Sequence, residues 1–244
     1  MRSFWVGVIL FSGVVLADED VRKEDLDRSL TFAARRGDMT SFNLAIALGA
    51  KLHAVDKDGN NTVVMAALGR QQSLLKTLLA KRVNPDLVGS EGQSALTSAT
   101  IHGDVEMVKM LLRAGARPDI RNVNGDSPLH LALMLKRDDI VAQLLAAGAD
   151  VNVPNGEGES PILVAVRYGN TRGFEALLPR RLNLDRRDET GRSPLFWAIL
   201  ENHEDMALAL IQRGARTDQR SEGYTPLQLA RIQDQARVVA LLGG

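Results

Sequence analysis

Apolar and polar positions along this chain recur with a period of 33 residues. Pairs of apolar residues fall at the same position of successive periods, at 78–79, 111–112, 144–145, 177–178 and 210–211. In the period that holds 144–145, Ile140 and Val141 precede the pair by four residues, which is the spacing of one face of a helix. A fixed period of this length indicates a stack of small units rather than one globular core.

Residues that begin and end helices recur with the same period. Ser127 is a suitable N-cap, and Pro128 fits the first helical position, where its missing N–H leaves no hydrogen bond unmade. Gly148 supplies the left-handed residue that ends a second helix, and Gly125 supplies the positive φ of a tight turn. Each unit is therefore predicted to contain a turn, a helix, a short turn, a second helix and a loop.

The motif SPLHLA at 127–132, with the segment AAGADVN at 146–152, resembles an ankyrin repeat. The resemblance covers residues 24–244 and implies an all-α solenoid, in which helix–turn–helix units are joined by hairpin-like loops. We expect six repeats and a short C-terminal capping unit that begins at residue 221. The expected repeats are 24–56, 57–89, 90–122, 123–155, 156–188 and 189–220, and they are numbered one to six below.

Some positions depart from the family pattern. His130 alone fills the histidine position of the motif, and in the family that histidine links adjacent repeats through hydrogen bonds. Arg82 and Arg181 replace the glycine that ends the second helix, which costs about 1 kcal/mol each if they adopt the left-handed conformation. We therefore expect units two and five to be looser than unit four.

The N-terminal residues resemble a secretory signal peptide. Arg2 precedes an apolar run at 4–16, and the run ends in a small-x-small pattern at Ala17. We therefore expect a signal peptide at 1–17, a tail at 18–23, and a periplasmic or secreted mature protein. The alternative is an uncleaved membrane anchor, although the run is shorter than the roughly 20 residues that a membrane span needs.

Composition and candidate chemistry argue against catalysis and against general nucleic-acid binding. The chain has no cysteine and a formal net charge of +0, so it lacks a thiol nucleophile and the charge of a general nucleic-acid binder. His203 and Glu204 begin like a zinc motif, but no second histidine follows. Asp56 lies in a segment that resembles a calcium loop, but the required downstream glutamate is missing. We predict no catalytic residue, no cofactor and no metal.

The candidate site is a protein-binding surface. In ankyrin-like stacks the turn tips and the ends of the first helices line the concave face, and aromatic, methionine and arginine side chains are common interface anchors. The resemblance places the following partner-binding residues at those helix ends: Ile101, His102, Met134, Leu135, Arg167 and Tyr168. The alternative is that the first member of each pair is partly buried packing. A run of arginines at 180–192 contains interleaved acids, which favours a solvated face over an anion site.

The sequence therefore predicts an exported, monomeric, non-catalytic ankyrin-type protein that binds a partner protein through its concave face. Such a protein would stabilise or inhibit a periplasmic enzyme, for example as an immunity-type inhibitor of a toxin. A membrane-anchored scaffold is the alternative if residues 1–17 are retained. We expect no nucleic-acid partner and, after cleavage, no membrane partner.

Overall fold

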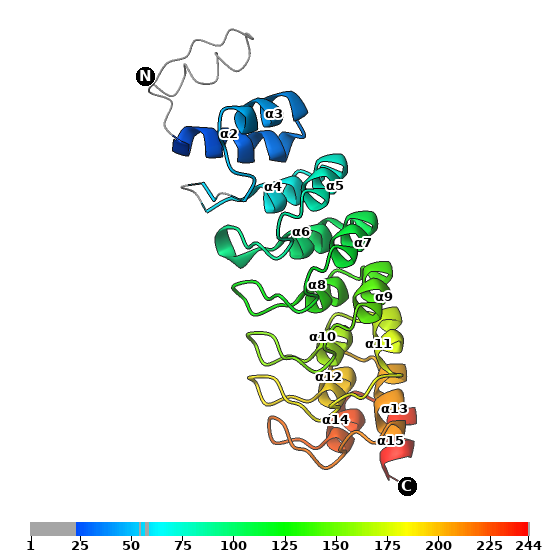
Figure 1. The fold of residues 1–244 in the computed structure, drawn as a ribbon. Coiled ribbons are helices and arrows are strands. Elements are labelled where there is room, and N and C mark those ends of the chain that lie inside the picture. The colour runs from blue at the N-terminus through cyan, green and yellow to red at the C-terminus, as the bar shows by residue number, and fades with distance from the viewer. Residues whose placement is uncertain (1–22, 54, 57–58, 244) are drawn as a thin grey trace.

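A computed structural model describes residues 23–243, except residues 54, 57 and 58. The described residues form an elongated stack of helix pairs, and hairpin-like loops project from one side of it (Figure 1). The predicted signal peptide at 1–17 and the tail residues 18–22 lie outside the described residues. Among the described helices, none combines the length and the apolar character that crossing a membrane would require.

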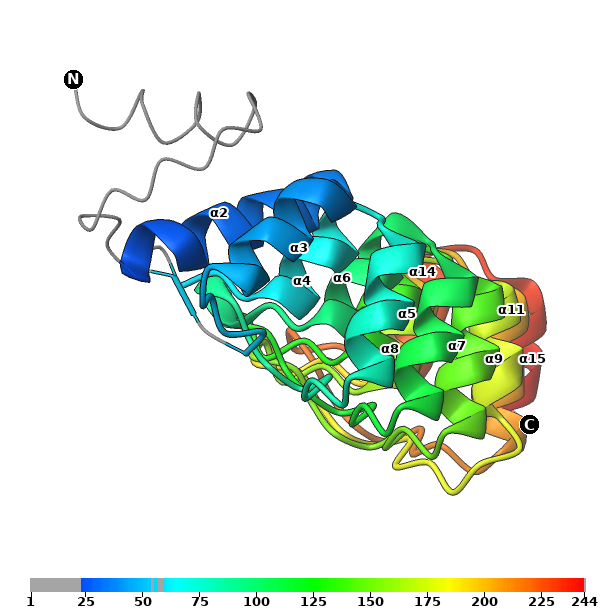
Figure 2. The same cartoon turned by 45° about the horizontal axis from the view of Figure 1, so that its top comes forward.

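The helices form two rows. The first helix of each unit belongs to the inner row, which consists of α2 (Lys23–Arg36), α4 (Thr62–Leu68), α6 (Ala95–His102), α8 (Pro128–Met134), α10 (Pro161–Arg167), α12 (Pro194–Leu200) and α14 (Pro226–Ile232). The second helix belongs to the outer row, which consists of α3 (Met39–Ala47), α5 (Gln72–Ala80), α7 (Val105–Arg113), α9 (Asp138–Ala146), α11 (Thr171–Leu177), α13 (Glu204–Gln212) and α15 (Ala236–Gly243). A short 3₁₀ helix, η1, spans Ser90–Gly92 in one of the loops. Several outer helices lie side by side in the turned view (Figure 2).

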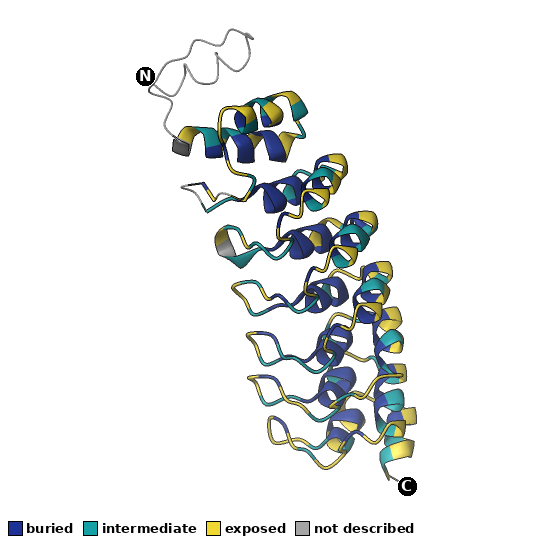
Figure 3. Cartoon of the chain, viewed as in Figure 1, coloured by how far each residue is buried: buried dark blue, intermediate teal, exposed yellow. Residues whose placement is uncertain are grey.

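Burial explains why the two rows differ in sequence. An inner helix packs against the inner helices of both neighbouring units and against its own outer helix, so the inner row is buried along most of its length (Figure 3). In α10, for example, only Arg167 is not buried. Outer helices bury a single face, and α7 buries Met107, Val108 and Leu111 while Glu106 stays exposed. The predicted all-α solenoid is confirmed.

The predicted helix ends of unit four are also confirmed. Ser127 caps α8 in a capping box with His130, and Pro128 occupies the first turn. Gly125 and Gly148 have φ values of 76° and 84°, in the region that favours glycine. His130 is fully buried, and its Nε2 lies 3.1 Å from the carbonyl oxygen of Glu159, which forms the expected link between units four and five.

Carboxylates form a second set of links between units. Asp86 Oδ1 accepts a hydrogen bond from the backbone N–H of Arg117 at 2.9 Å, and Asp185 Oδ1 accepts one from the N–H of Arg216 at 2.8 Å. Each bond joins the loop of one unit to the loop of the next. These hydrogen bonds hold each loop against the loop of the next unit, where few apolar side chains are available to pack.

The two arginines that replace the helix-ending glycine differ in conformation. Arg82 does adopt the left-handed conformation, with φ of 58°, but Arg181 is not among the residues of positive φ. Helix α11 ends earlier, at Leu177, and Pro179 follows two residues later, where it cannot continue a helix. The strain expected at Arg181 is therefore absent, while the looseness expected of units two and five stays a prediction.

Candidate partner-binding surface

Three consecutive inner helices end in partly exposed apolar residues at nearly the same position. Ile101 lies in the last turn of α6, Leu135 directly follows α8, and Tyr168 directly follows α10. Their exposed fractions are 37%, 39% and 37%. Because α8 packs against both α6 and α10, the three helix ends are neighbours in the stack.

The course of each inner helix explains this exposure. In α8, Leu133 is completely buried, Met134 is partly buried against the core, and Leu135 is exposed. The chain thus leaves the core within three residues. Met134 therefore fits the alternative of partly buried packing. His102 is exposed, and its Nδ1 lies 2.8 Å from the carbonyl oxygen of Ser98 in the same helix.

Arg167 is held by its own chain. Its Nη1 donates hydrogen bonds to Glu157 Oε2 at 3.0 Å and to Glu159 Oε1 at a shorter distance. The guanidinium carbon lies 5.9 Å from the ring centroid of Tyr168 and 5.2 Å from that of Trp197. The hydrogen bond to Glu159 raises the pKa of Arg167, against the smaller opposing effect of burial. Arg167 therefore positions the Tyr168 ring rather than presenting a free charge.

The sequence interpretation missed Trp197, which lies at the centre of this polar network. The residue is only 8% exposed, and the centroid of its ring lies 4.6 Å from the guanidinium carbon of Arg192. Its Nε1 donates a hydrogen bond to Asp188 Oδ2 at 2.6 Å. Burial raises the pKa of Asp188, but hydrogen bonds from Thr190, the Arg192 N–H and Trp197 outweigh it, so that the net shift is downward.

A signal for Trp197 was present in the repeat. Trp197 falls 33 residues after Val164 and 66 after Leu131, at an inner-helix position that is buried in all three units. A tryptophan at a position held by aliphatic residues in the two preceding units indicates a local change of packing, and tryptophan is a frequent interface anchor. The surface divides into an apolar part, at Ile101 and Leu135, and an aromatic and charged part, at Arg167 and Tyr168, with Trp197 buried beneath Arg167.

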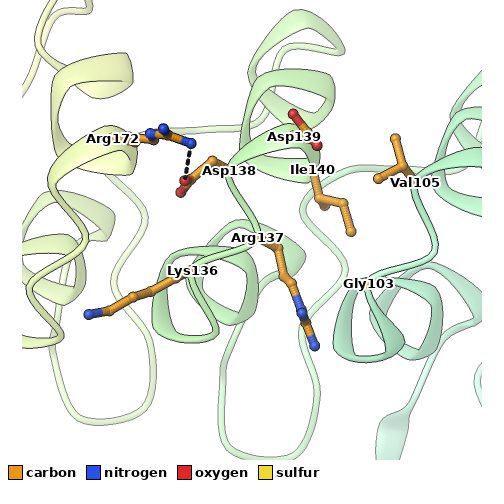
Figure 4. A pocket seen from close by; sticks show the side chains of 8 residues that line it. All are labelled: Gly103, Val105, Lys136, Arg137, Asp138, Asp139, Ile140 and Arg172. Atoms are coloured by element: carbon orange, nitrogen blue, oxygen red, sulfur yellow. Dashed lines mark ion pairs between the residues drawn. The ribbon is translucent and has the colours of Figure 1, made fainter.

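The turn between α8 and α9 lines a hollow of about 260 Å³. In Figure 4, Arg137 and Lys136 point away from each other, and Arg172 lies against Asp138 at 3.9 Å. The remaining lining residues are Gly103, Val105, Asp139 and Ile140. The lining contains neither a hydroxyl nor an imidazole. Within the described part of the chain, no cluster of three or more potential ligand side chains could hold a metal ion.

Comparison with known proteins agrees with this architecture. The stack is a helical solenoid built from units of 33 residues, and the family model for ankyrin repeats (3 copies) matches overlapping segments at 30–122, 70–155, 103–188, 129–221 and 162–243. The chain belongs to the ankyrin-repeat family. Ankyrin repeats are protein–protein interaction modules, and the fold and the family indicate that class for this chain.

One solved structure illustrates the shared fold. The chain is similar to the ankyrin repeat domain of Bcl-3, whose crystal structure is described as that of a unique member of the IkappaB protein family. The two are 24% identical, the match covers 88% of this chain and 98% of that chain, and the TM-score is 0.76. This level of identity supports the fold alone. No curated protein sequence matches the chain.

Proposed function

We propose that this chain is an exported, non-catalytic protein that holds a partner protein on its concave face. The observation that carries the proposal is the exposure of Ile101, Leu135 and Tyr168, hereafter the inner-helix patch, at the ends of three adjacent inner helices. Solvent-exposed apolar and aromatic side chains that gather on one surface are typical of interface anchors.

The surroundings of the inner-helix patch support the same function. Arg167 and Glu157 form a polar border next to Tyr168, and their ion pair is already made in the unbound chain. A partner therefore meets an aromatic ring whose position is fixed before binding, which lowers the entropy lost on association. A polar rim around an apolar centre is the arrangement that most protein interfaces share.

Export is proposed from the sequence of residues 1–17. The apolar run and the small-x-small pattern at Ala17 support cleavage before Asp18 and a periplasmic or secreted mature chain. In that compartment the protein would stabilise or inhibit an enzyme. N-terminal sequencing of protein from the native host tests this part of the proposal. We expect Asp18 as the first residue, and soluble protein that starts at Met1 would contradict export.

The binding proposal is tested with the double variant Leu135→Ala and Tyr168→Ala. A partner is first captured from the native host, and its affinity is then measured by calorimetry. Loss of two central anchors should weaken binding by about 2–4 kcal/mol. Ile232→Ala is the matched control, because Ile232 is 63% exposed at the end of inner helix α14, outside the inner-helix patch. Unchanged affinity in a folded double variant would place the interface elsewhere.

A further inference from the structure

Units five and six carry six exposed arginines that have no carboxylate partner among the described residues. These residues, hereafter the arginine patch, are Arg180, Arg181, Arg186, Arg187, Arg213 and Arg220. The side chains of the first three make no hydrogen bond or ion pair with the described part of the chain. The other three donate hydrogen bonds only to neutral backbone carbonyls, and Arg187 in addition lies near enough to Asp218 for their charges to attract.

Contacts between neighbouring units bring two pairs of these arginines together. Arg187 Nη1 donates to the carbonyl oxygen of Arg220 at 3.2 Å, although the two residues are one repeat apart. Arg213 donates to the carbonyl oxygen of Leu178, and Arg180 and Arg213 line the same hollow. The arginine patch therefore spans the loops that follow α11 and α13, whereas the inner-helix patch lies at the ends of inner helices.

Three of the acidic residues interleaved with these arginines make hydrogen bonds elsewhere, whereas Glu189 stays exposed. Asp185 accepts the backbone N–H of Arg216, and Asp188 is buried under Trp197. Asp218 is paired in a fork geometry with Arg216, with N–O distances of 3.1 and 3.0 Å. The alternation of charges along the sequence favoured a solvated face. In space, Asp185 and Asp188 complete the loops, and Asp218 forms its ion pair with Arg216 while its charge also acts on Arg187 at longer range.

The hollow adds an apolar component to the arginine patch. It has a volume of about 120 Å³, and Leu178, Leu182 and Leu184 line it together with Arg180 and Arg213. The three leucines are only partly buried. A hollow of this size accepts one aliphatic side chain, and the two guanidinium groups at its border would meet negative charges on either side of that side chain.

We propose that the arginine patch binds an acidic segment of a partner protein, with an aliphatic side chain between carboxylates. The planar guanidinium fork matches a carboxylate in a bidentate geometry and stays charged at every physiological pH. A single-stranded nucleic acid would instead need aromatic side chains for base stacking, and neither the arginine patch nor the leucine-lined hollow contains one. This proposal is independent of the inner-helix patch.

The test uses the full chain and a fluorescein-labelled peptide of sequence EEELEEE, followed by fluorescence anisotropy. We expect binding at about 50 mM salt that weakens steeply towards about 300 mM, because exposed charges are screened. The double variant Arg180→Glu and Arg186→Glu should weaken binding at least about tenfold, since attraction becomes repulsion. Both side chains are exposed and neither makes a hydrogen bond or ion pair with a described residue, so the variant should fold normally. Replacing the central leucine of the peptide by serine should weaken binding about threefold or more.

A charge-matched control separates the arginine patch from net charge. Arg113→Glu with Arg231→Glu makes the same change in net charge at exposed positions of α7 and α14. We expect this control to bind the peptide within about twofold of the original chain. Equal loss in both double variants would overturn the proposal, and so would no binding at low salt. A third outcome concerns phosphatidylglycerol vesicles. If the original chain bound these vesicles but not the peptide, and the double variant Arg180→Glu with Arg186→Glu lost vesicle binding, the proposal would be overturned in favour of a lipid surface.

Discussion

Units four and five are adjacent in the stack, but they satisfy their helix ends in different ways. In unit four, Ser127 caps α8 in a capping box with His130, and Gly148 follows α9 in the left-handed conformation. In unit five, Ser160 also precedes its inner helix, but its hydroxyl is buried and has no hydrogen-bond partner. Leu163 occupies the position of the histidine, so unit five lacks the capping box.

Unit five is stabilised instead through its interface with unit four. Asn170 accepts a hydrogen bond from the Gly173 N–H at 2.8 Å, and its amide donates to the carbonyl oxygen of Leu133 at 3.1 Å. Gly173 allows this approach, because an added Cβ would lie 2.5 Å from Leu133 Cδ2. The stability of a unit in a stack of repeats includes its interfaces with the neighbouring units. Contacts with unit four therefore compensate for the missing capping box of unit five.

The largest effect is expected from His130→Leu, which gives unit four the residue of unit five. The change removes the hydrogen bonds to Ser127 and to the carbonyl oxygen of Glu159 inside the stack. We expect a loss of about 3 kcal/mol, because a buried acceptor loses its partner. Urea unfolding followed by circular dichroism measures it.

Gln228→Leu is the matched control for His130→Leu. Gln228 fills the same position in the last unit and caps α14 with Thr225, but it is exposed, so water replaces the lost bond. We expect a loss below about 1 kcal/mol for the control. Equal losses of unfolding free energy in the two variants would show that the burial of His130 between units four and five adds nothing to the strength of its hydrogen bonds.

Gly173→Ala should have the next largest effect, about 2 kcal/mol of destabilisation. Alanine normally stabilises a helix interior, but here the new methyl group would overlap Leu133 Cδ2 of unit four. Gly148→Ala is the comparison, because nothing lies within 4 Å of its added Cβ and only its φ of 84° is unfavourable. We expect about 1 kcal/mol there.

Adding Leu133→Val separates these two causes. Shortening the Leu133 side chain should recover part of the loss in Gly173→Ala and none of the loss in Gly148→Ala, as measured by urea midpoints of all single and double variants. If the losses of unfolding free energy in Leu133→Val and Gly173→Ala simply added in the double variant, close packing between units four and five would not be the reason for the glycine.

The stability of unit four should also depend on pH. Burial lowers the pKa of His130, although the hydrogen bond to the Glu159 carbonyl and the charge of Asp126 oppose the shift. As the pH falls, the unfolded chain therefore takes up the proton first. This contribution to stability is complete above about pH 6.5 and is lost below it, by at most about 1.4 kcal/mol per pH unit.

Urea unfolding of the original chain and of His130→Leu at several pH values measures this effect. The difference between the two proteins should narrow as the pH falls below about 6.5. A constant difference from neutral pH to acid would contradict the lowered pKa of His130.

Apart from the link of His130 to the next unit, which the resemblance implies, the features that the sequence predicts are the ones whose partners lie within one unit. Ser127, Pro128 and Gly148 act on helix ends only a few residues away, so the motif alone indicates their conformation. Asn170 bonds to Leu133, which is 37 residues distant, and no spacing within unit five indicates that contact. The same reason applies in part to Arg167, because Glu157 and Glu159 lie in its own unit but Trp197 lies in the next one.

The smallest effects are expected when the serine that precedes the inner helix is replaced by alanine, in unit four and, separately, in unit five. Ser127→Ala removes the acceptor of the His130 N–H and should destabilise the chain by about 1 kcal/mol. Ser160→Ala removes a buried hydroxyl that has no partner, so no hydrogen bond is lost and the cost of burying a polar group disappears. We expect a change within about 0.5 kcal/mol of zero, or a slight gain.

Paired urea titrations of these two variants decide whether the units differ at their first helix ends. Both serines are buried, and both precede a proline at the start of an inner helix, so the substitutions remove the same atoms from similar surroundings. The difference between the two results therefore reports the hydrogen bonds of the cap rather than packing. An equal loss of about 1 kcal/mol in Ser160→Ala would mean that the serine caps the inner helix in unit five as it does in unit four. The interface between the two units would then not be compensating for a missing cap.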